Sequence, residues 1–247
     1  MKIAVIGACG HVGLPFSLVC AKAGHRVWGI DRNEELINEV NGGYVPYIEH
    51  GAEKILKDQL LEGNIEFTSN SSFVKQSDVV AIMLGTPVDE ENNPRLDDLF
   101  NFVDYTLTPF LKKQTLILLR STVAPGTTEQ VRNRIEANTG WKEGEDFYLV
   151  FCPERVLQTR SIEETETLPQ LIGAFNDAAY TVAKNFNLTY NKSEQIQLTP
   201  REAEIGKLMT NMYRYVTFAL ANEFWIIGEK QGVNIERVTK AINHGYK

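Results

Sequence analysis

The stretch MKIAVIGACGHVGLPFSLVCAKAGHRVWGID (residues 1–31) decides how the rest of the chain is organised. It begins with an apolar run over 2–6, which is typical of a buried parallel strand. A glycine turn follows, and the apolar segment 14–23 predicts a helix that ends at a glycine. Residues 27–30 predict a second strand, with Asp31 at its end. This order is the βαβ pattern that opens a dinucleotide-binding domain.

The glycine turn contains Gly7, Gly10 and Gly13, spaced Gly-x-x-Gly-x-x-Gly. Glycines let the backbone approach a pyrophosphate closely, and the helix that follows offers free N–H groups and a partial positive charge. Asp31 follows at about the 20-residue distance expected of an acid that binds the adenosine ribose hydroxyls. Because a carboxylate there would repel a 2′-phosphate, the sequence favours NAD over NADP, a preference that the neighbouring Arg32 weakens slightly.

The composition is that of an ordinary globular protein, with 247 residues, 43% hydrophobic and 23% charged. A net charge of −7 without a basic tract argues against nucleic acid or an anionic membrane as the main partner. No apolar stretch approaches the length of a membrane span, and the start of the chain does not read as a signal peptide. The three cysteines are too few and scattered for a disulfide framework or a zinc site. We therefore expect a cytoplasmic setting and no metal.

Strands that alternate with helices predict a doubly wound, mostly parallel α/β sheet of the Rossmann type over 1–198. Within it the pattern predicts one helix over 96–112, an irregular polar segment over 156–167 and a short last strand over 188–190.

The pattern changes at Thr199, where a helix of about thirty residues begins, longer than a typical globular helix. Thr199 and Glu202 form a capping-box start, and a second helix is expected over 235–243. We place a domain boundary near residue 198, with 199–247 forming a long helix and the start of a helical segment.

Four predicted strands end in small or polar residues, and such sheets bind ligands beyond the carboxyl ends of their strands. Any one of these ends could be ordinary turn chemistry, but four on one edge favour a cofactor cleft. The four ends are 7–13, Gly85-Thr86-Pro87, Ser121-Thr122 and Pro153-Glu154.

Five stretches, spread in order over nearly the whole chain, carry a family resemblance. They are GACGHVGLP (7–15), LGTPVD (84–89), STVAPGTTE (121–129), CPERV (152–156) and EIGKLMTNMYRYVTFALANEF (204–224). Together they resemble the UDP-glucose/GDP-mannose dehydrogenase family of nucleotide-sugar dehydrogenases. The last stretch is the most specific, and Cys-Pro-Glu-Arg-Val is similar to the branch that oxidises UDP-N-acetyl-hexosamines, notably N-acetylmannosamine.

The resemblance implies oxidation of the C6 alcohol of a nucleotide sugar, a UDP-hexose or UDP-N-acetylhexosamine, to a carboxylate. In that family two hydrides pass in turn to two NAD+ molecules, and the second oxidation uses a thiohemiacetal and a thioester on a cysteine. The resemblance thus implies NAD as cofactor, a nucleotide sugar as substrate and a role in polysaccharide biosynthesis. It also implies a homodimer paired through the 199–230 helix, whose apolar surface is wider than one small domain needs.

Matched residue by residue, the resemblance also implies roles for individual side chains. The backbone of the glycine turn would bind the pyrophosphate, and Thr86 would line the cofactor pocket. Thr122 and Glu154 would hold the water for the alcohol proton, and Lys207 and Asn211 would stabilise the alkoxide-like oxygen. The candidate cofactor-binding residues are Gly7, Gly10, His11, Val12, Gly13, Asp31, Arg32, Gly85, Thr86, Pro87, Ser121 and Thr122, and the candidate catalytic residues are Thr122, Glu154, Lys207 and Asn211.

The nucleophilic cysteine of the family has no counterpart here. Cys9 lies in the glycine turn, Cys20 on the buried face of the first helix, and Cys152 at a position that is not nucleophilic in the family. We therefore expect this chain to be a fragment that binds NAD but lacks the nucleophile and the C-terminal domain that binds the UDP-sugar.

Three other interpretations stay open from the sequence alone. A dehydrogenase of the 3-hydroxyacyl-CoA or 6-phosphogluconate type shares the glycine turn and a long helix with a lysine and an asparagine. A non-catalytic NAD-binding module fits the absence of the nucleophile. Glu204, Lys207 and Asn211 also fit a simple solvated polar stripe on one helix face.

Overall fold

The computed structural model describes residues 1–91 and 93–245 and divides the chain into two compact units, 1–207 and 208–247. In the described part of the first unit, eight strands form one sheet with the order β3-β2-β1-β4-β5-β6-β7-β8. Neighbouring strands are parallel except β6 and β7, which confirms the doubly wound, mostly parallel Rossmann-type sheet. The strands are β1 (Lys2–Ile6), β2 (Arg26–Ile30), β3 (Ile65–Thr68), β4 (Val79–Ile82), β5 (Leu116–Leu119), β6 (Tyr148–Phe151), β7 (Gln170–Ala174) and β8 (Gln195–Leu198).

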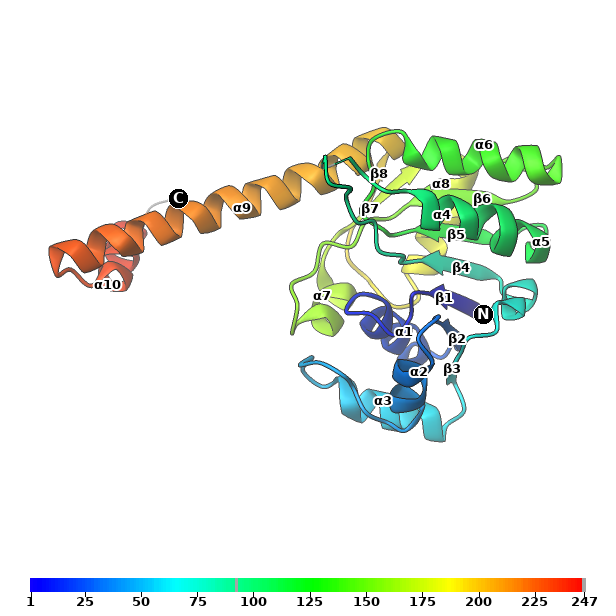
Figure 1. Cartoon of the computed structure of the whole chain (residues 1–247), viewed down its shortest axis with the longest axis horizontal. Helices are drawn as coiled ribbons and strands as arrows, with labels where there is room; N and C mark the ends of the chain where they lie inside the picture. Colours follow the sequence, from blue (N-terminus) through cyan, green and yellow to red (C-terminus); the bar gives the residue numbers. More distant parts are fainter. Residues whose placement is uncertain (92, 246–247) are drawn as a thin grey trace. The chain divides into compact units, whose positions relative to one another are not determined.

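Helices cover both faces of this sheet because the side chains of each central strand alternate between two apolar clusters. In β5, for example, Leu116 and Leu118 face the cluster with α1, whereas Ile117 and Leu119 face the cluster with α4 and α6. Figure 1 shows α4 and α6 on one side of the central strands and α1 on the other. The helices of this unit are α1 (Gly13–Lys22), α2 (Glu34–Asn41), α3 (Ala52–Leu61), η1 (Ser71–Gln76), α4 (Asp97–Phe102), η2 (Val103–Leu107), α5 (Thr108–Phe110), α6 (Thr127–Thr139), α7 (Ser161–Thr167) and α8 (Asp177–Asn187).

The structure corrects the sequence prediction after α8. The segment 188–190 is a turn, and the last strand is β8. The N–H groups of Thr189 and Tyr190 donate to carbonyls at the end of α8, so they are not available to a sheet.

Two further predictions were wrong in part. The polar segment 156–167 is irregular only at its start, because 161–167 form α7, which buries Ile162 and Thr165. The single helix predicted over 96–112 is divided into α4, a π-helical turn η2 and α5. Pro109 lies in the first turn of α5, and its missing N–H removes one bond from the helical ladder there.

The long helix α9 (Pro200–Gln231) starts with the predicted capping box, since Thr199 N donates to Glu202 Oε2 at 2.8 Å and Glu202 N to Thr199 Oγ1 at 3.3 Å. From Leu208 on it belongs, together with α10 (Ile235–Ile242), to the second unit. The turn between α9 and α10 is centred on Gly232, which has a φ of +64°.

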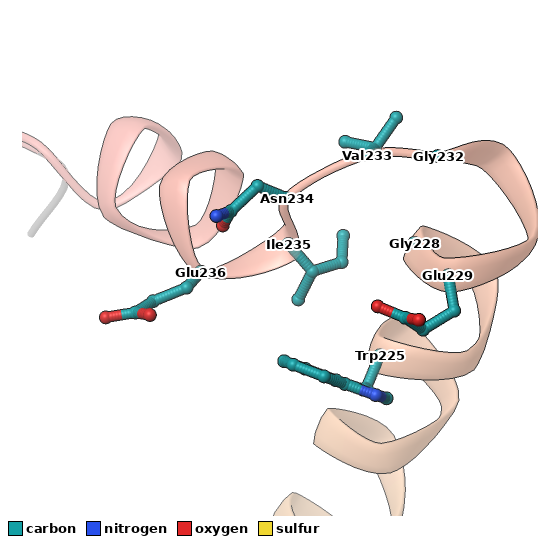
Figure 2. A pocket seen from close by; sticks show the side chains of 8 residues that line it. All are labelled: Trp225, Gly228, Glu229, Gly232, Val233, Asn234, Ile235 and Glu236. Carbon is teal, nitrogen blue, oxygen red and sulfur yellow. The ribbon is translucent and has the colours of Figure 1, made fainter.

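Two hydrogen bonds close this turn as a Schellman motif, Gly232 N to Glu229 O at 3.2 Å and Val233 N to Gly228 O at 2.9 Å. A hollow lies beneath the turn, and Figure 2 shows the side chains of Trp225 and Ile235 facing each other across it. None of the predicted site residues lines this hollow.

Candidate functional site

The strand order places the four predicted strand ends in one row. β1, β4, β5 and β6 are consecutive parallel neighbours, so the segments that follow them leave the same edge of the sheet. β2 lies on the other side of β1, which brings Asp31 next to the glycine turn. Adjacent strands are about 4.8 Å apart, so side chains from these ends reach one another.

The glycine turn is shaped by two very close backbone approaches. Gly7 has a φ of +77°, and a Cβ there would lie 2.7 Å from the Met83 carbonyl oxygen. A Cβ on Gly13 would lie 2.1 Å from the Gly7 carbonyl oxygen. A Cβ on the exposed Gly10, however, would meet nothing closer than that oxygen at 3.5 Å. The packing of the protein therefore requires Gly7 and Gly13, whereas the space beside Gly10 is open.

Three consecutive backbone N–H groups of the turn are available to an anion. Within the described residues, the N–H groups of His11, Val12 and Gly13 have no hydrogen-bond acceptor. The Gly10 carbonyl accepts the first helical bond of α1 from Leu14 N at 3.0 Å, so these amides lie at the helix N-terminus. Free amides and the helix dipole together fit a diphosphate.

Asp31 is fixed beside this turn. Its Oδ2 accepts from Cys9 N at 3.0 Å and its Oδ1 from Asn33 N at 3.1 Å. The neighbouring Arg32 is exposed, and its guanidinium lies 3.6 Å from Asp98 of α4. The cation next to Asp31 is thus already paired with an acid, which reduces its attraction for a 2′-phosphate.

At the ends of β4 and β5, the Thr86 hydroxyl donates to the Thr122 carbonyl, which ties the two segments together. Gly85 has open space around its Cα, Pro87 is exposed, and the Thr122 side chain is exposed as well. Ser121 is buried, and its hydroxyl lies 3.5 Å from the Ile82 carbonyl.

Glu154, at the end of β6, is held by a buried cation that the sequence analysis did not select. Its carboxylate pairs with Arg120, whose side chain is fully buried, and also accepts from Arg155 N at 2.9 Å and Val156 N at 3.2 Å. The Arg120 guanidinium stacks on the Phe16 ring at 4.5 Å. Burial is the largest single effect and disfavours the charge, but the nearby Glu154, Cys152 and Tyr190 together outweigh it and raise the pKa of Arg120 above its usual value.

Lys207 is brought to the same strand end, because its ammonium donates to the Glu154 backbone carbonyl. Two of the sequence stretches that carry the family resemblance, 152–156 and 204–224, therefore meet at this point. Lys207 is the last residue of the first unit, whereas Asn211, one helical turn further along α9, belongs to the second unit.

Glu204 has a separate task. This buried carboxylate accepts from Thr128 N at 2.7 Å, from the Thr128 hydroxyl at 2.6 Å and from Gly126 N. It therefore occupies the N-terminus of α6 and caps it from the first turns of α9.

Cys9, Cys20 and Cys152 are all buried, as expected for Cys20. Burial, reinforced by the nearby Asp31, raises the pKa of Cys9 to about 12, and burial also raises the pKa values of Cys20 and Cys152. These thiols have neither the access nor the thiolate character of a nucleophile.

Among residues 1–91 and 93–245, no three His, Cys, Asp or Glu side chains form a group that could hold a metal ion. The helices in the same part of the chain are too short or too polar to cross a bilayer.

An anion on the amides of the turn would lie one strand away from the Asp31 carboxylate, a spacing that suits a diphosphate joined to a ribose. The first unit is thus a dinucleotide-binding domain of the Rossmann type. Comparison with known proteins agrees: the profile of the UDP-glucose/GDP-mannose dehydrogenase family, NAD binding domain, matches residues 1–190, and that of its central domain matches residues 201–247. The chain belongs to this family, and its cofactor is NAD.

Similar proteins include the UDP-N-acetyl-D-mannosamine dehydrogenase of Pyrococcus horikoshii, which is 33% identical over 98% of this chain and 57% of its own length. The structure of the Pyrococcus enzyme has a TM-score of 0.91 at 32% identity, over 100% of this chain and 58% of that one. The ternary complex of GDP-mannose dehydrogenase from Pseudomonas aeruginosa has a TM-score of 0.90 at 26% identity, over 99% and 57%. The chain thus spans about half the length of the relatives it matches.

Sequence reasoning missed Arg120, Glu204 as a cap, and Tyr47, whose hydroxyl contacts the glycine turn. The sequence does contain a signal for Arg120, which directly follows the apolar run Leu-Ile-Leu-Leu. An arginine buried at the end of such a strand requires an acidic partner, so an ion pair could have been predicted there. Tyr47 lies in a loop between two helices and has no comparable signal.

Proposed function

We propose that this chain is the cofactor half of an enzyme that oxidises the C6 alcohol of a nucleotide sugar, a UDP-hexose or a UDP-N-acetylhexosamine, to a carboxylate. NAD would supply the hydride acceptor for both oxidation steps. The contact between Lys207 and the Glu154 carbonyl carries the proposal, because it joins the dinucleotide edge to the start of α9. Because the chain belongs to this family, we prefer this function to that of a dehydrogenase of the 3-hydroxyacyl-CoA or 6-phosphogluconate type.

Each side chain would act according to its chemistry. The Lys207 ammonium, fixed by the Glu154 carbonyl, would stabilise negative charge that develops on the substrate oxygen, and Asn211 would donate a second hydrogen bond. Thr122 would hold the water that receives the alcohol proton. Glu154 shares this water in our proposal, and its pairing with Arg120 keeps its carboxylate in one orientation.

At the other end of the cleft, the amides of His11 and Val12 would bind the pyrophosphate and Asp31 the adenosine ribose. Gly85, Thr86, Pro87 and Ser121 would line the remaining cofactor site. The proposed cofactor site also includes Gly7, Gly10, Gly13 and Arg32.

At the level of the organism, we propose a cytoplasmic enzyme of polysaccharide biosynthesis, since its relatives are nucleotide-sugar dehydrogenases. The similarity to UDP-N-acetyl-D-mannosamine dehydrogenases favours UDP-N-acetyl-D-mannosamine as the substrate. We propose that it is bound mainly by residues outside this chain. We also propose a division near residue 198 between the NAD-binding domain and the helical segment, and a homodimer through 199–230.

Calorimetry with the 247-residue chain tests the cofactor part of this proposal. We expect NAD+ to bind more tightly than NADP+. In Gly10→Ala the new methyl group points into the open anion site, so affinity for NAD+ should fall by roughly tenfold or more. The melting temperature of this variant should stay close to that of the parent, since the protein itself has room for the Cβ.

Absorbance at the NADH band tests the catalytic part. Because the three thiols are buried, we expect no sustained NADH production from UDP-N-acetylmannosamine or UDP-glucose by this chain alone. Continuous turnover would contradict the proposal that this chain is only the cofactor half of the enzyme. Failure to bind NAD+ would contradict the cofactor site itself.

A further inference from the structure

The segment 44–51, which connects α2 to α3, runs across the glycine turn, and we call it the strap. Its Tyr47 hydroxyl donates to the Gly10 carbonyl at 3.0 Å. Further along, His50 N donates to the Thr159 carbonyl at 3.2 Å, and the buried Glu49 carboxylate lies 3.4 Å from Ile162 N. The strap therefore bonds to the glycine turn after β1 and to the connection that follows β6.

The hydrogen bond from Tyr47 helps to fix the peptide plane between Gly10 and His11. The Gly10 carbonyl belongs to the same planar peptide as the His11 N–H, and in a trans peptide these two groups point in opposite directions. With the carbonyl held by Tyr47 and by Leu14 N, the His11 N–H must point out of the N-terminus of α1. That N–H is one of the three in the turn for which the described residues offer no acceptor.

The rings of Tyr47 and His11 provide a second contact at the same place. Their centroids are 4.1 Å apart, and the planes are tilted by 38°. The contact holds the side chain of His11 against the strap. His11 is also the residue whose backbone N–H is oriented by the Gly10–His11 peptide.

Tyr47 also keeps its proton. Burial, together with the nearby Glu49 and Cys9, raises the pKa of the Tyr47 hydroxyl above its usual value. The hydroxyl is therefore a donor throughout the neutral pH range, which is the role that the Gly10 carbonyl requires.

We propose that Tyr47 is a positioning residue for the cofactor, which holds the Gly10–His11 peptide with its N–H directed at the pyrophosphate. The inference rests on the NAD site of the proposed function and assigns to it a residue outside the glycine turn. Tyr47 acts on the diphosphate through the peptide, and it need not contact the ligand.

The test compares Tyr47→Phe, which keeps the ring and removes the hydroxyl, with Tyr44→Phe as a matched control. Tyr44 lies in the same strap, but its side chain is exposed. Calorimetry would measure NAD+, ADP-ribose and adenosine with each protein. Loss of one positioning hydrogen bond should weaken NAD+ and ADP-ribose by about three- to tenfold in Tyr47→Phe and leave adenosine within about twofold. Tyr44→Phe should bind all three ligands like the parent.

Amide NMR provides an independent measurement on the same proteins. ADP-ribose should shift the His11 amide resonance in the parent, and this shift should be reduced in Tyr47→Phe. Equal affinities of parent and Tyr47→Phe, or an equal loss for adenosine and ADP-ribose, would overturn the positioning role while leaving the NAD site intact. A parent chain that binds neither NAD+ nor ADP-ribose would overturn the NAD site and this inference together.

Discussion

Arg120 illustrates how single residues shape this site. A guanidinium with a fully buried side chain is tolerated because one face packs on Phe16 and one nitrogen pairs with Glu154. Another of its nitrogens lies 3.5 Å from the Cys152 sulfur. Removing either charge of such a buried pair typically costs about 3–5 kcal/mol, because the other charge is left without compensation. The pair therefore links the ends of β5 and β6 and holds Glu154, one of the proposed catalytic residues, in place.

His25 is a second residue whose burial has a measurable consequence. Its ring nitrogens lie 3.3 Å from the terminal amine of Met1 and 2.7 Å from the Thr189 hydroxyl. Burial, followed by the charge of the terminal ammonium, lowers the pKa of His25 below its usual 6.5.

This shift makes stability depend on pH in a defined direction. Below about pH 6.5 the unfolded chain gains a proton on His25 that the folded chain resists, so stability should fall as the pH is lowered from 7.5 to 5.5. Urea unfolding at several pH values would measure this slope. His25→Gln should flatten it, whereas His50→Gln, which changes an exposed histidine, should keep it. Identical slopes in the parent and His25→Gln would contradict the assignment.

At the scale of elements, several helix N-termini are capped by specific side chains. Asn33, Asn176 and Asn234 cap the helices that follow them, as local sequence rules lead one to expect. The cap of α6 is different, since Glu204 comes from α9, far along the sequence. This cap fastens the start of the long helix to the unit that carries the dinucleotide site.

Glu204→Gln should therefore weaken the first unit. The amide keeps one acceptor but loses the charge that faces Gly126 N and Thr128 N, which should lower the free energy of unfolding by about 1–2 kcal/mol. Urea denaturation would measure the change. Glu223→Gln, at an exposed position of the same helix, is the matched control and should change it by less than about 0.5 kcal/mol. An unchanged midpoint in Glu204→Gln would show that Glu204 does not contribute as a cap.

At the scale of the whole molecule, the chain divides into a unit with a large core and a unit rich in exposed apolar side chains. A soluble surface seldom leaves so many of them uncovered. Large apolar residues of α9 that are exposed include Met209, Met212, Tyr213, Tyr215, Val216, Phe218, Leu220, Phe224, Trp225, Ile226 and Ile227. They support the proposed pairing of two copies through 199–230.

Sedimentation of the chain at micromolar concentration tests this pairing. We expect a dimer in the parent and a shift to monomer in Phe218→Asp, because a charge would be buried without a partner. Leu61→Asp adds the same charge at a leucine that is 89% exposed in the first unit, and it should remain dimeric. A monomeric parent chain would contradict the pairing.

The sequence by itself determined β1, the glycine turn, α1 and β2, because their signals lie within neighbouring residues: an apolar run, glycine spacing and a helical apolar segment. It also determined the capping box of α9. The same local reasoning misplaced the last strand at 188–190, since this segment is a turn in which Tyr190 packs against Phe186 of α8.

Only the tertiary structure decided which strand ends lie side by side. It therefore also decided the contacts between distant segments: Arg120 pairs with Glu154, Lys207 donates to the Glu154 carbonyl, and Glu204 caps α6. The hydroxyl of Tyr47 above the glycine turn belongs to the same group of contacts. Each joins residues that are distant in sequence, and their partners are fixed by strand order and helix packing. Local periodicity carries no information about that order, so the turn could be predicted but the residues that orient it could not.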